Sequence, residues 1–151
     1  MEQQILTTNL CQIKAVFLDN LGVRKFKIKN SQTSIEYFRD ILPVDISHRE
    51  AFLAIYLNRN NITVGYEIIS IGGISGTIVD IRVLFQYALI SNASSIIVCH
   101  NHPSGNLQPS ALDKKLTNKI DRAGKLIDIK LLDHIIITED KHYSFADNGL
   151  L

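Results

Sequence analysis

The stretch AFLAIYL, residues 51–57, is apolar throughout and constrains the fold more than any other part of the chain. A strand with one face in water alternates apolar and polar residues, whereas a strand covered on both faces reads as a continuous apolar run. NRNN (58–61) then leads as a turn into ITVGYEIIS (62–70), so the pattern predicts a hairpin. SSIIVC (94–99) predicts another short buried strand. The chain must therefore supply layers for both faces of a sheet.

Amphipathic helices can supply these layers. The segment 33–42 offers Thr33 and Glu36 as a capping box, and Asp80 stands where an N-cap should. A third helix is expected from Ser110 to about Leu126. The residues expected to face the core are Ile81, Leu84, Phe85, Ala88 and Leu89 in the second helix, and Leu112, Leu116, Ile120 and Ala123 in the third.

We therefore predict one α/β domain over residues 1–151, with three α/β/α layers around a mixed sheet. The sheet is expected to be mixed because the hairpin is antiparallel and the helical connections permit parallel neighbours. QIKAVFL (12–18) and DNLG (19–22) predict a strand and a turn, so residues 1–32 are interpreted as an N-terminal strand or hairpin extension. The segment 127–138 predicts one long or two short strands.

Charge and cysteine content bear on the compartment and the partners. The formal net charge is +1, which gives no general field for DNA or an anionic membrane. No apolar run approaches the roughly 18 residues that span a bilayer, and the N-terminus lacks the basic start and apolar core of a signal peptide. Two cysteines, Cys11 and Cys99, are too few for a disulfide framework, and Cys99 is expected to be a buried strand residue. We expect a cytoplasmic protein with no membrane partner.

The segment HNHPSGNLQPSALD, residues 100–113, carries the chemistry. Imidazole is the commonest metal ligand, and two histidines at i and i+2 on extended chain point to the same side, as His100 and His102 would. Asp113, one turn into the following helix, can face back toward them. Three protein ligands leave a fourth tetrahedral position for water, which is the arrangement of a catalytic zinc site.

The residues between these candidate ligands have roles of their own. Pro103 and Gly105 favour a sharp, reproducible turn that would hold the ligands in place. Ser110 could donate its hydroxyl proton to an oxyanion or to a bound water. The plainer interpretation is that Ser110 and Asp113 only mark a helix N-terminus. The ordered set of His, His, Ser and Asp at a strand-to-helix loop favours the metal site.

This segment resembles the JAMM motif of JAB/MPN metalloproteases, and HNHPSG with the later LLDHIII resembles the RadC family from about residue 33 to the C-terminus. The resemblance implies a cytidine-deaminase-like fold, one zinc ion per chain, and water-mediated hydrolysis of a peptide or isopeptide bond. Carried over by position, His100, His102 and Asp113 are the ligands and Ser110 is the transition-state donor.

The same resemblance implies an upstream glutamate as general base. Glu50, just before the first core strand, holds the position that RadC-like sequences give it, and Glu67 is the alternative. His134 also belongs to the resemblance. We expect it to be a buried structural histidine, with Asp133 orienting either it or a neighbouring loop, and we expect His48 and His142 at the surface.

Three other functions compete with a hydrolase. A deaminase would need His-x-Glu together with a later Pro-Cys-x-x-Cys, and this combination is absent. A DNA-repair-associated accessory protein with a structural or vestigial metal site is the main alternative, but RadC-like proteins carry an N-terminal helix-hairpin-helix region for which residues 1–32 are too short. Lys115, Lys119 and Arg122 are better explained as a solvated face. An inactive domain is less economical, because every motif position is filled. Substrate and oligomeric state are left open.

Overall fold

The structure is a computed structural model that describes residues 25–73 and 76–151. The strand expected at 12–18, its turn and Cys11 lie outside these residues, as do two residues of the glycine-containing connection 72–76. The elements are α1 (Ser31–Ile41), β1 (Ala51–Leu57), β2 (Thr63–Ile71), α2 (Ile81–Ile90), β3 (Ser95–Asn101), α3 (Ala111–Leu126), β4 (Lys130–Ile137) and β5 (His142–Ser144).

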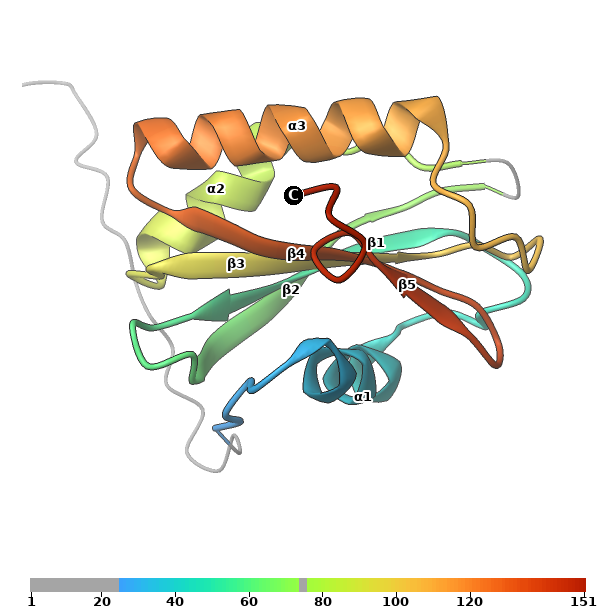
Figure 1. Ribbon diagram of the computed structural model, residues 1–151, viewed down its shortest axis with the longest axis horizontal. Coiled ribbons are helices and arrows are strands. Elements are labelled where there is room, and N and C mark those ends of the chain that lie inside the picture. The colour runs from blue at the N-terminus through green and yellow to red at the C-terminus, as the bar shows by residue number, and fades with distance from the viewer. Residues whose placement is uncertain (1–24, 74–75) are drawn as a thin grey trace, which may run out of the picture.

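The strands form one sheet in the order β2-β1-β3-β4-β5 (Figure 1). β1 pairs antiparallel with both β2 and β3, and β5 pairs antiparallel with β4. β3 and β4 are parallel, because α3 crosses over between them. The prediction of a mixed sheet is confirmed, and the segment 127–138 contributes a single strand, β4.

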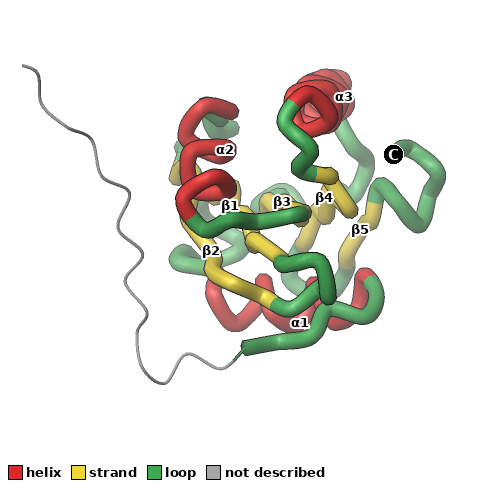
Figure 2. Tube along the Cα trace, turned by 90° about the vertical axis from the view of Figure 1, so that its left-hand side faces the viewer, coloured by secondary structure: helices red, strands yellow, loops and turns green. Residues whose placement is uncertain are grey.

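Helices cover both faces of the sheet. α1 lies below the sheet in the view of Figure 1, and α2 and α3 lie above it. Figure 2, turned by 90° about the vertical axis, shows the same arrangement. The α2 and α3 side holds a core that includes Phe52, Tyr56 and Ile120, while the α1 side holds one that includes Phe38 and Leu53. The predicted three-layer α/β/α architecture is confirmed.

The apolar run 51–57 is explained by its central place between β2 and β3. Successive side chains of a strand point to opposite faces, so Phe52, Ala54 and Tyr56 pack toward α2 and α3. Leu53, Ile55 and Leu57 pack toward α1, and the whole strand is buried. The same alternation puts His100 of β3 on the α2 and α3 side, opposite Phe52 in the β1–β3 register.

Two details of the predicted helices are wrong. α1 begins after Asn30, whose side chain accepts from the backbone N–H of Thr33, so Thr33 is the third residue of the capping box and not its N-cap. Asp80 caps α2 and Ser110 caps α3, as predicted. Leu89 is 58% exposed and Leu112 is 76% exposed, although both were expected to face the core.

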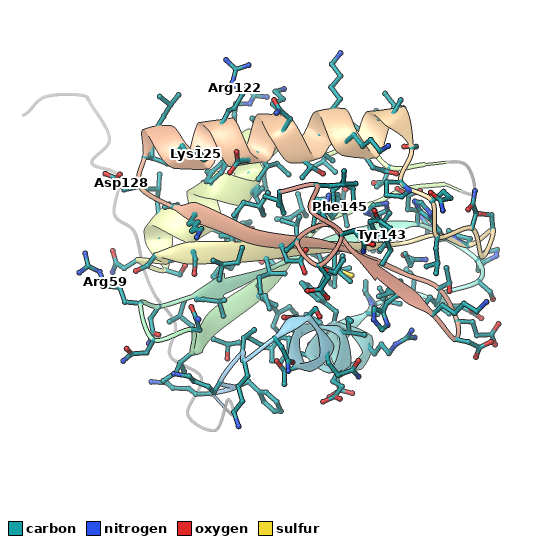
Figure 3. The ribbon with its side chains drawn as sticks, viewed as in Figure 1. Arg59, Arg122, Lys125, Asp128, Tyr143 and Phe145 are labelled. Carbon is teal, nitrogen blue, oxygen red and sulfur yellow. The ribbon has the colours of Figure 1, made fainter. Side chains whose placement is uncertain are left out.

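Basic side chains of α3 are exposed to solvent. Lys115, Lys119 and Arg122 are exposed, and Figure 3 shows Arg122 projecting away from the sheet. Lys125 forms an exposed ion pair with Asp121, with 2.6 Å between Nζ and Oδ2. Among the described residues, no helix combines the length and the apolar character needed to cross a bilayer.

Candidate metal centre

The end of β3, the loop after it and the first turn of α3 bring three side chains together. β3 extends two residues beyond the predicted end at Cys99, so His100 lies within the strand and is 1% exposed. The backbone N–H of His102 donates to the carbonyl of Ile137 at 2.9 Å, which holds the chain beside the end of β4. Asp113 is the third residue of α3.

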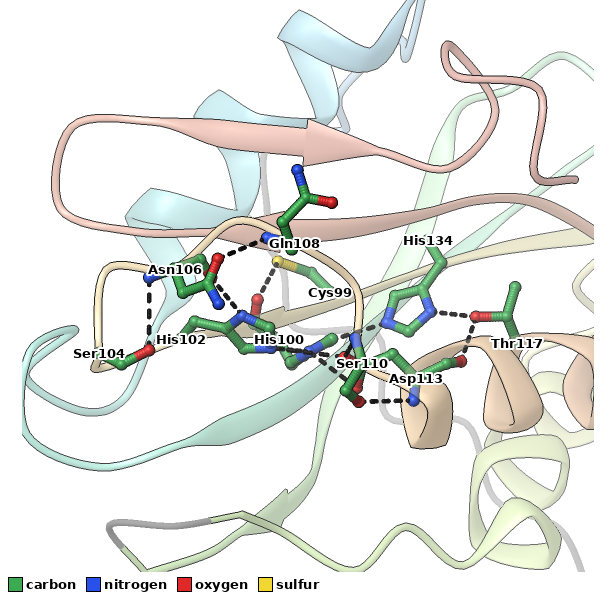
Figure 4. A network of polar contacts seen from close by, with 10 residues as sticks. All are labelled: Cys99, His100, His102, Ser104, Asn106, Gln108, Ser110, Asp113, Thr117 and His134. Carbon is green, nitrogen blue, oxygen red and sulfur yellow. Dashed lines mark hydrogen bonds and ion pairs between the residues drawn. The ribbon is translucent and has the colours of Figure 1, made fainter.

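The ligand atoms of these three residues lie within 4.8 Å of one another. The Nε2 atoms of His100 and His102 are 2.9 Å apart. Nε2 of His100 is 3.3 Å from Oδ1 of Asp113, and Nε2 of His102 is 3.6 Å from Oδ2. Figure 4 shows the two rings and the carboxylate pointing toward one another. The predicted ligand set is thus brought together in space.

Asp113 serves two local purposes at once. Its Oδ2 accepts from the backbone N–H of Ser110 at 2.7 Å, and Oγ of Ser110 accepts from the N–H of Asp113 at 3.0 Å. This reciprocal pair is a capping box at the start of α3. The two interpretations of Ser110 and Asp113 are therefore not exclusive, because the carboxylate that closes the cap also faces both histidines.

Charge at the cluster is set by these contacts. Burial would raise the pKa of Asp113, but its close contacts with the imidazoles of His100 and His102 hold it far below its ordinary range. The pKa of His102 is raised, chiefly by its hydrogen bond to Asp113, against the effect of burial. The carboxylate therefore stays ionised and attracts positive charge. Two imidazoles and one ionised carboxylate are a donor set that suits zinc, so the residues fit the metal that the motif implies.

The turn after His102 orients its ring. Gly105 has φ of 76°, a left-handed conformation that favours glycine, and its N–H donates to the carbonyl of His102 at 3.0 Å. The turn brings the backbone carbonyl of Asn106 to 2.6 Å from Nδ1 of His102. A carbonyl can only accept, so Nδ1 carries a proton, and Nε2 is the ring nitrogen that faces the cluster.

Glu50 lies beside this cluster, immediately before β1. Together with His100, Asp113 and the apolar side chains of Phe52 and Leu112, it lines a cavity of about 330 Å³. Burial raises the pKa of its carboxyl group, an effect opposed by the nearby His100 and His102. Glu67 lies instead in the middle of β2, opposite Ala54, and is not among the residues that line the cavity. The geometry favours Glu50 as the acid–base group, although its role stays a prediction.

Asn101 is a residue of this region that the sequence did not single out. Its Oδ1 accepts from the N–H of Ala51 at 2.8 Å, and its Nδ2 donates to the carbonyls of Arg49 at 2.7 Å and Ile46 at 2.9 Å. The side chain therefore joins the peptide groups on both sides of Glu50. Because neighbouring strand residues face opposite ways, Asn101 holds the segment of Glu50 while His100 faces the cluster.

We expect Asn101→Ala to destabilise the protein by about 1–3 kcal/mol or more, since buried backbone groups would lose their partners. Urea unfolding monitored by circular dichroism measures this loss. Asn118→Ala, at an exposed position of α3, is the matched control and should change stability by no more than about 0.5 kcal/mol. Equal midpoints for the two variants would contradict the importance given to Asn101.

Two further side chains contact the cluster from behind. His134 of β4 is completely buried, and its Nε2 lies 2.8 Å from Nδ1 of His100. Thr117, one turn after Asp113 in α3, lies behind His134. Burial lowers the pKa of His134 well below its ordinary value, so this ring is neutral. Asp133 accepts from Ser144 and the N–H of Ala146 and so orients a neighbouring segment.

The remaining histidines and the described cysteine behave as expected. His48 and His142 are exposed, and Cys99 is fully buried in β3. The sequence assigned no role to Thr117, although its spacing of four residues from Asp113 places both on one side of a helix. His134 was singled out by the LLDHIII motif, but its hydrogen-bond partner Thr117 was not.

The chain is similar to proteins from several bacteria. It is 45% identical over 126 residues to a UPF0758 protein of Flavobacterium johnsoniae, covering 82% of this chain and 55% of the relative. It is 35% identical over 145 residues to a UPF0758 protein of Chlorobaculum parvum, covering 93% of this chain and 64% of the relative. The UPF0758 protein YfjY of Escherichia coli is 40% identical over 121 residues, which are 79% of this chain and 76% of that protein.

These relatives' names state no activity. The chain spans little more than half the length of several of them, 55% for the Flavobacterium protein. The family described as the RadC-like JAB domain matches residues 28–150, which include the sheet, all three helices and the cluster. The chain therefore belongs to the RadC-like JAB domain family.

Proposed function

We propose that this protein is a zinc-dependent hydrolase of the JAMM type that cleaves a peptide or isopeptide bond. The observation that carries the proposal is the convergence of the His100, His102 and Asp113 ligand atoms within 4.8 Å, at a cavity that Glu50 also lines. A zinc ion held by three protein ligands polarises a carbonyl group and lowers the pKa of a water molecule from 15.7 to about 7.

Each chain residue then has a defined task. Glu50 accepts a proton from the attacking water and delivers it to the leaving amine, and burial raises its pKa toward the range that suits a general base and acid. Asp113 presents its carboxylate to the cluster, while its capping box with Ser110 fixes the start of α3. Ser110 retains a hydroxyl proton while its Oγ accepts from Asp113, and in the proposal this proton is donated to the developing oxyanion.

The lining of the cavity combines apolar and polar side chains, as a substrate-binding site would. Apolar side chains of Phe52, Val79, Leu112 and Leu116 line it beside the polar cluster. Leu112 is exposed here because it borders the cavity and does not pack into the core. An apolar wall next to a few converging polar groups is typical of a binding site that orients a substrate.

Metal content is the experiment that tests the proposal. The purified protein should contain about one zinc per chain by elemental analysis after zinc is supplied and the excess removed. His102→Ala should lose most of it, because only two of the ligands would remain. Zinc at 100 times its dissociation constant should stabilise the wild type by about 2.7 kcal/mol, so its thermal midpoint should fall on chelation.

His142→Ala is the matched control, since His142 is exposed and is not one of the clustered ligands. This variant should keep its zinc. Little zinc in both the wild type and this control would refute the hydrolase. DNA binding that depends on salt and survives His102→Ala would support the accessory protein instead. The exposed basic residues of α3 motivate this second test.

A further inference from the structure

A chain of three hydrogen bonds leads away from His100 into the interior. Nδ1 of His100 is 2.8 Å from Nε2 of His134, and Nδ1 of His134 is 2.6 Å from Oγ1 of Thr117. Oγ1 of Thr117 is 2.7 Å from the backbone carbonyl of Asp113. Figure 4 shows the chain running from His100 past His134 to Thr117. It therefore starts at one candidate ligand and ends on the backbone of another.

The chemistry of the last group fixes the direction of every bond. A backbone carbonyl can only accept, so the hydroxyl proton of Thr117 points to Asp113. Oγ1 of Thr117 must then accept from Nδ1 of His134. A neutral imidazole carries one ring proton, so Nε2 of His134 has a lone pair and accepts from Nδ1 of His100.

We infer that His134 and Thr117 are positioning residues that hold His100 in the tautomer with its proton on Nδ1 and its lone pair on Nε2. This inference rests on the proposed metal site. Nε2 is the nitrogen that faces His102 and Asp113, so the chain leaves it free to bind a cation. The partner of the other ring nitrogen commonly fixes the tautomer and orientation of a histidine that binds metal.

The chain also explains why a polar residue stands at 117, on the buried side of α3. Thr117 is 3% exposed and lies on the same side of the helix as Ile120 and Gly124. With an apolar residue there, Nδ1 of His134 would lose its acceptor. The His134 proton could then move to Nε2, and His100 would have to accept on Nδ1 and carry its own proton on Nε2, toward the cluster. That proton would compete with the metal.

Thr117→Val and Thr117→Ser form the test pair. Valine has nearly the shape of threonine but cannot accept, whereas serine keeps the hydroxyl. We expect Thr117→Val to weaken zinc binding about 10–100-fold in competition with a chromophoric chelator, and Thr117→Ser to restore it to near the wild-type value. His134→Ala should weaken zinc to a similar degree, with His142→Ala as its control. The urea midpoint of each metal-free variant separates this effect from a loss of folding.

Nitrogen-15 spectra of the histidine rings provide a readout that needs no activity. In the metal-free and zinc-loaded wild type, His134 should carry its proton on Nδ1, and Thr117→Val should change that assignment. Wild-type zinc affinity in Thr117→Val, or a proton on Nε2 of His134 in the wild type, would overturn the inference while the hydrolase could stand. A wild type that binds no zinc would refute the proposed function and the metal-positioning role with it, even if the spectra showed the expected tautomer.

Discussion

Glu50→Gln should lower the hydrolysis of a cleavable substrate by about 10²–10⁴-fold while zinc per chain stays at the wild-type value. Glutamine keeps the shape of the side chain but cannot take a proton from water at neutral pH. Glu50 lines the cavity without being one of the three clustered ligands, so metal content should not change. The measurement is the initial rate on a panel of peptides and of isopeptides linked through lysine Nζ, beside elemental analysis of the same samples.

Glu67→Gln is the matched control, because it makes the same chemical change in β2, away from the residues that line the cavity. It should leave the rate within about twofold, well below the loss expected at a general base. An unchanged rate in Glu50→Gln, or a loss confined to Glu67→Gln, would remove Glu50 from the acid–base role. Loss of zinc in Glu50→Gln would mean that Glu50 acts on the metal and not on the proton.

Phe52→Ala should cost about 3–5 kcal/mol of the free energy of unfolding. Phe52 is 1% exposed in the central strand β1, so its removal leaves a cavity that the surrounding strands cannot fill. Its ring also stacks on His100, with centroids 6.0 Å apart and an interplanar angle of 15°, and meets the ring of His134 edge-on. Urea unfolding in the presence of a chelator measures the packing contribution without any contribution from metal.

Leu126→Ala removes an apolar side chain that is 86% exposed and should change stability by no more than about 0.5 kcal/mol. Phe52→Leu fills part of the space and should cost less than Phe52→Ala. If Phe52→Ala lost less than about 1 kcal/mol, the packing around the two buried histidines would be looser than the structure indicates.

Much of the fold could be predicted because burial leaves a direct record in the sequence. An apolar run at 51–57 requires cover on both faces, and together with the alternation of strands and helices it predicted the three layers. The errors arose where two chemical explanations fit the same residues. Thr33 is a good N-cap in isolation, but Asn30 stands three residues earlier and takes that position. Leu112 has helical spacing for the core, but the first turn of α3 borders the cavity.

The residues of the candidate site also differ in whether the sequence could predict them. His100, His102 and Asp113 could be found because their spacing along one loop is short and carries a recognisable pattern. Asn101 and Thr117 could not, because their partners are 50 and 17 residues away and only the sheet and the crossover helix bring them together. His134 was expected to be buried and structural; it is buried, and its contact with His100 depends on the parallel pairing of β3 and β4.

Asp113 both caps α3 and faces the two histidines, and this affects how sequences of this family should be compared. Asp113 closes the cap of α3, Asn101 holds the segment before β1, and His100 is enclosed between Phe52 and His134. A relative without the proposed metal site would still need these residues, or substitutes for them, in order to fold. His102 contributes only a ring at the partly exposed edge of the cluster. If the proposed metal site is correct, its replacement should be the most informative sequence marker of a relative without that site.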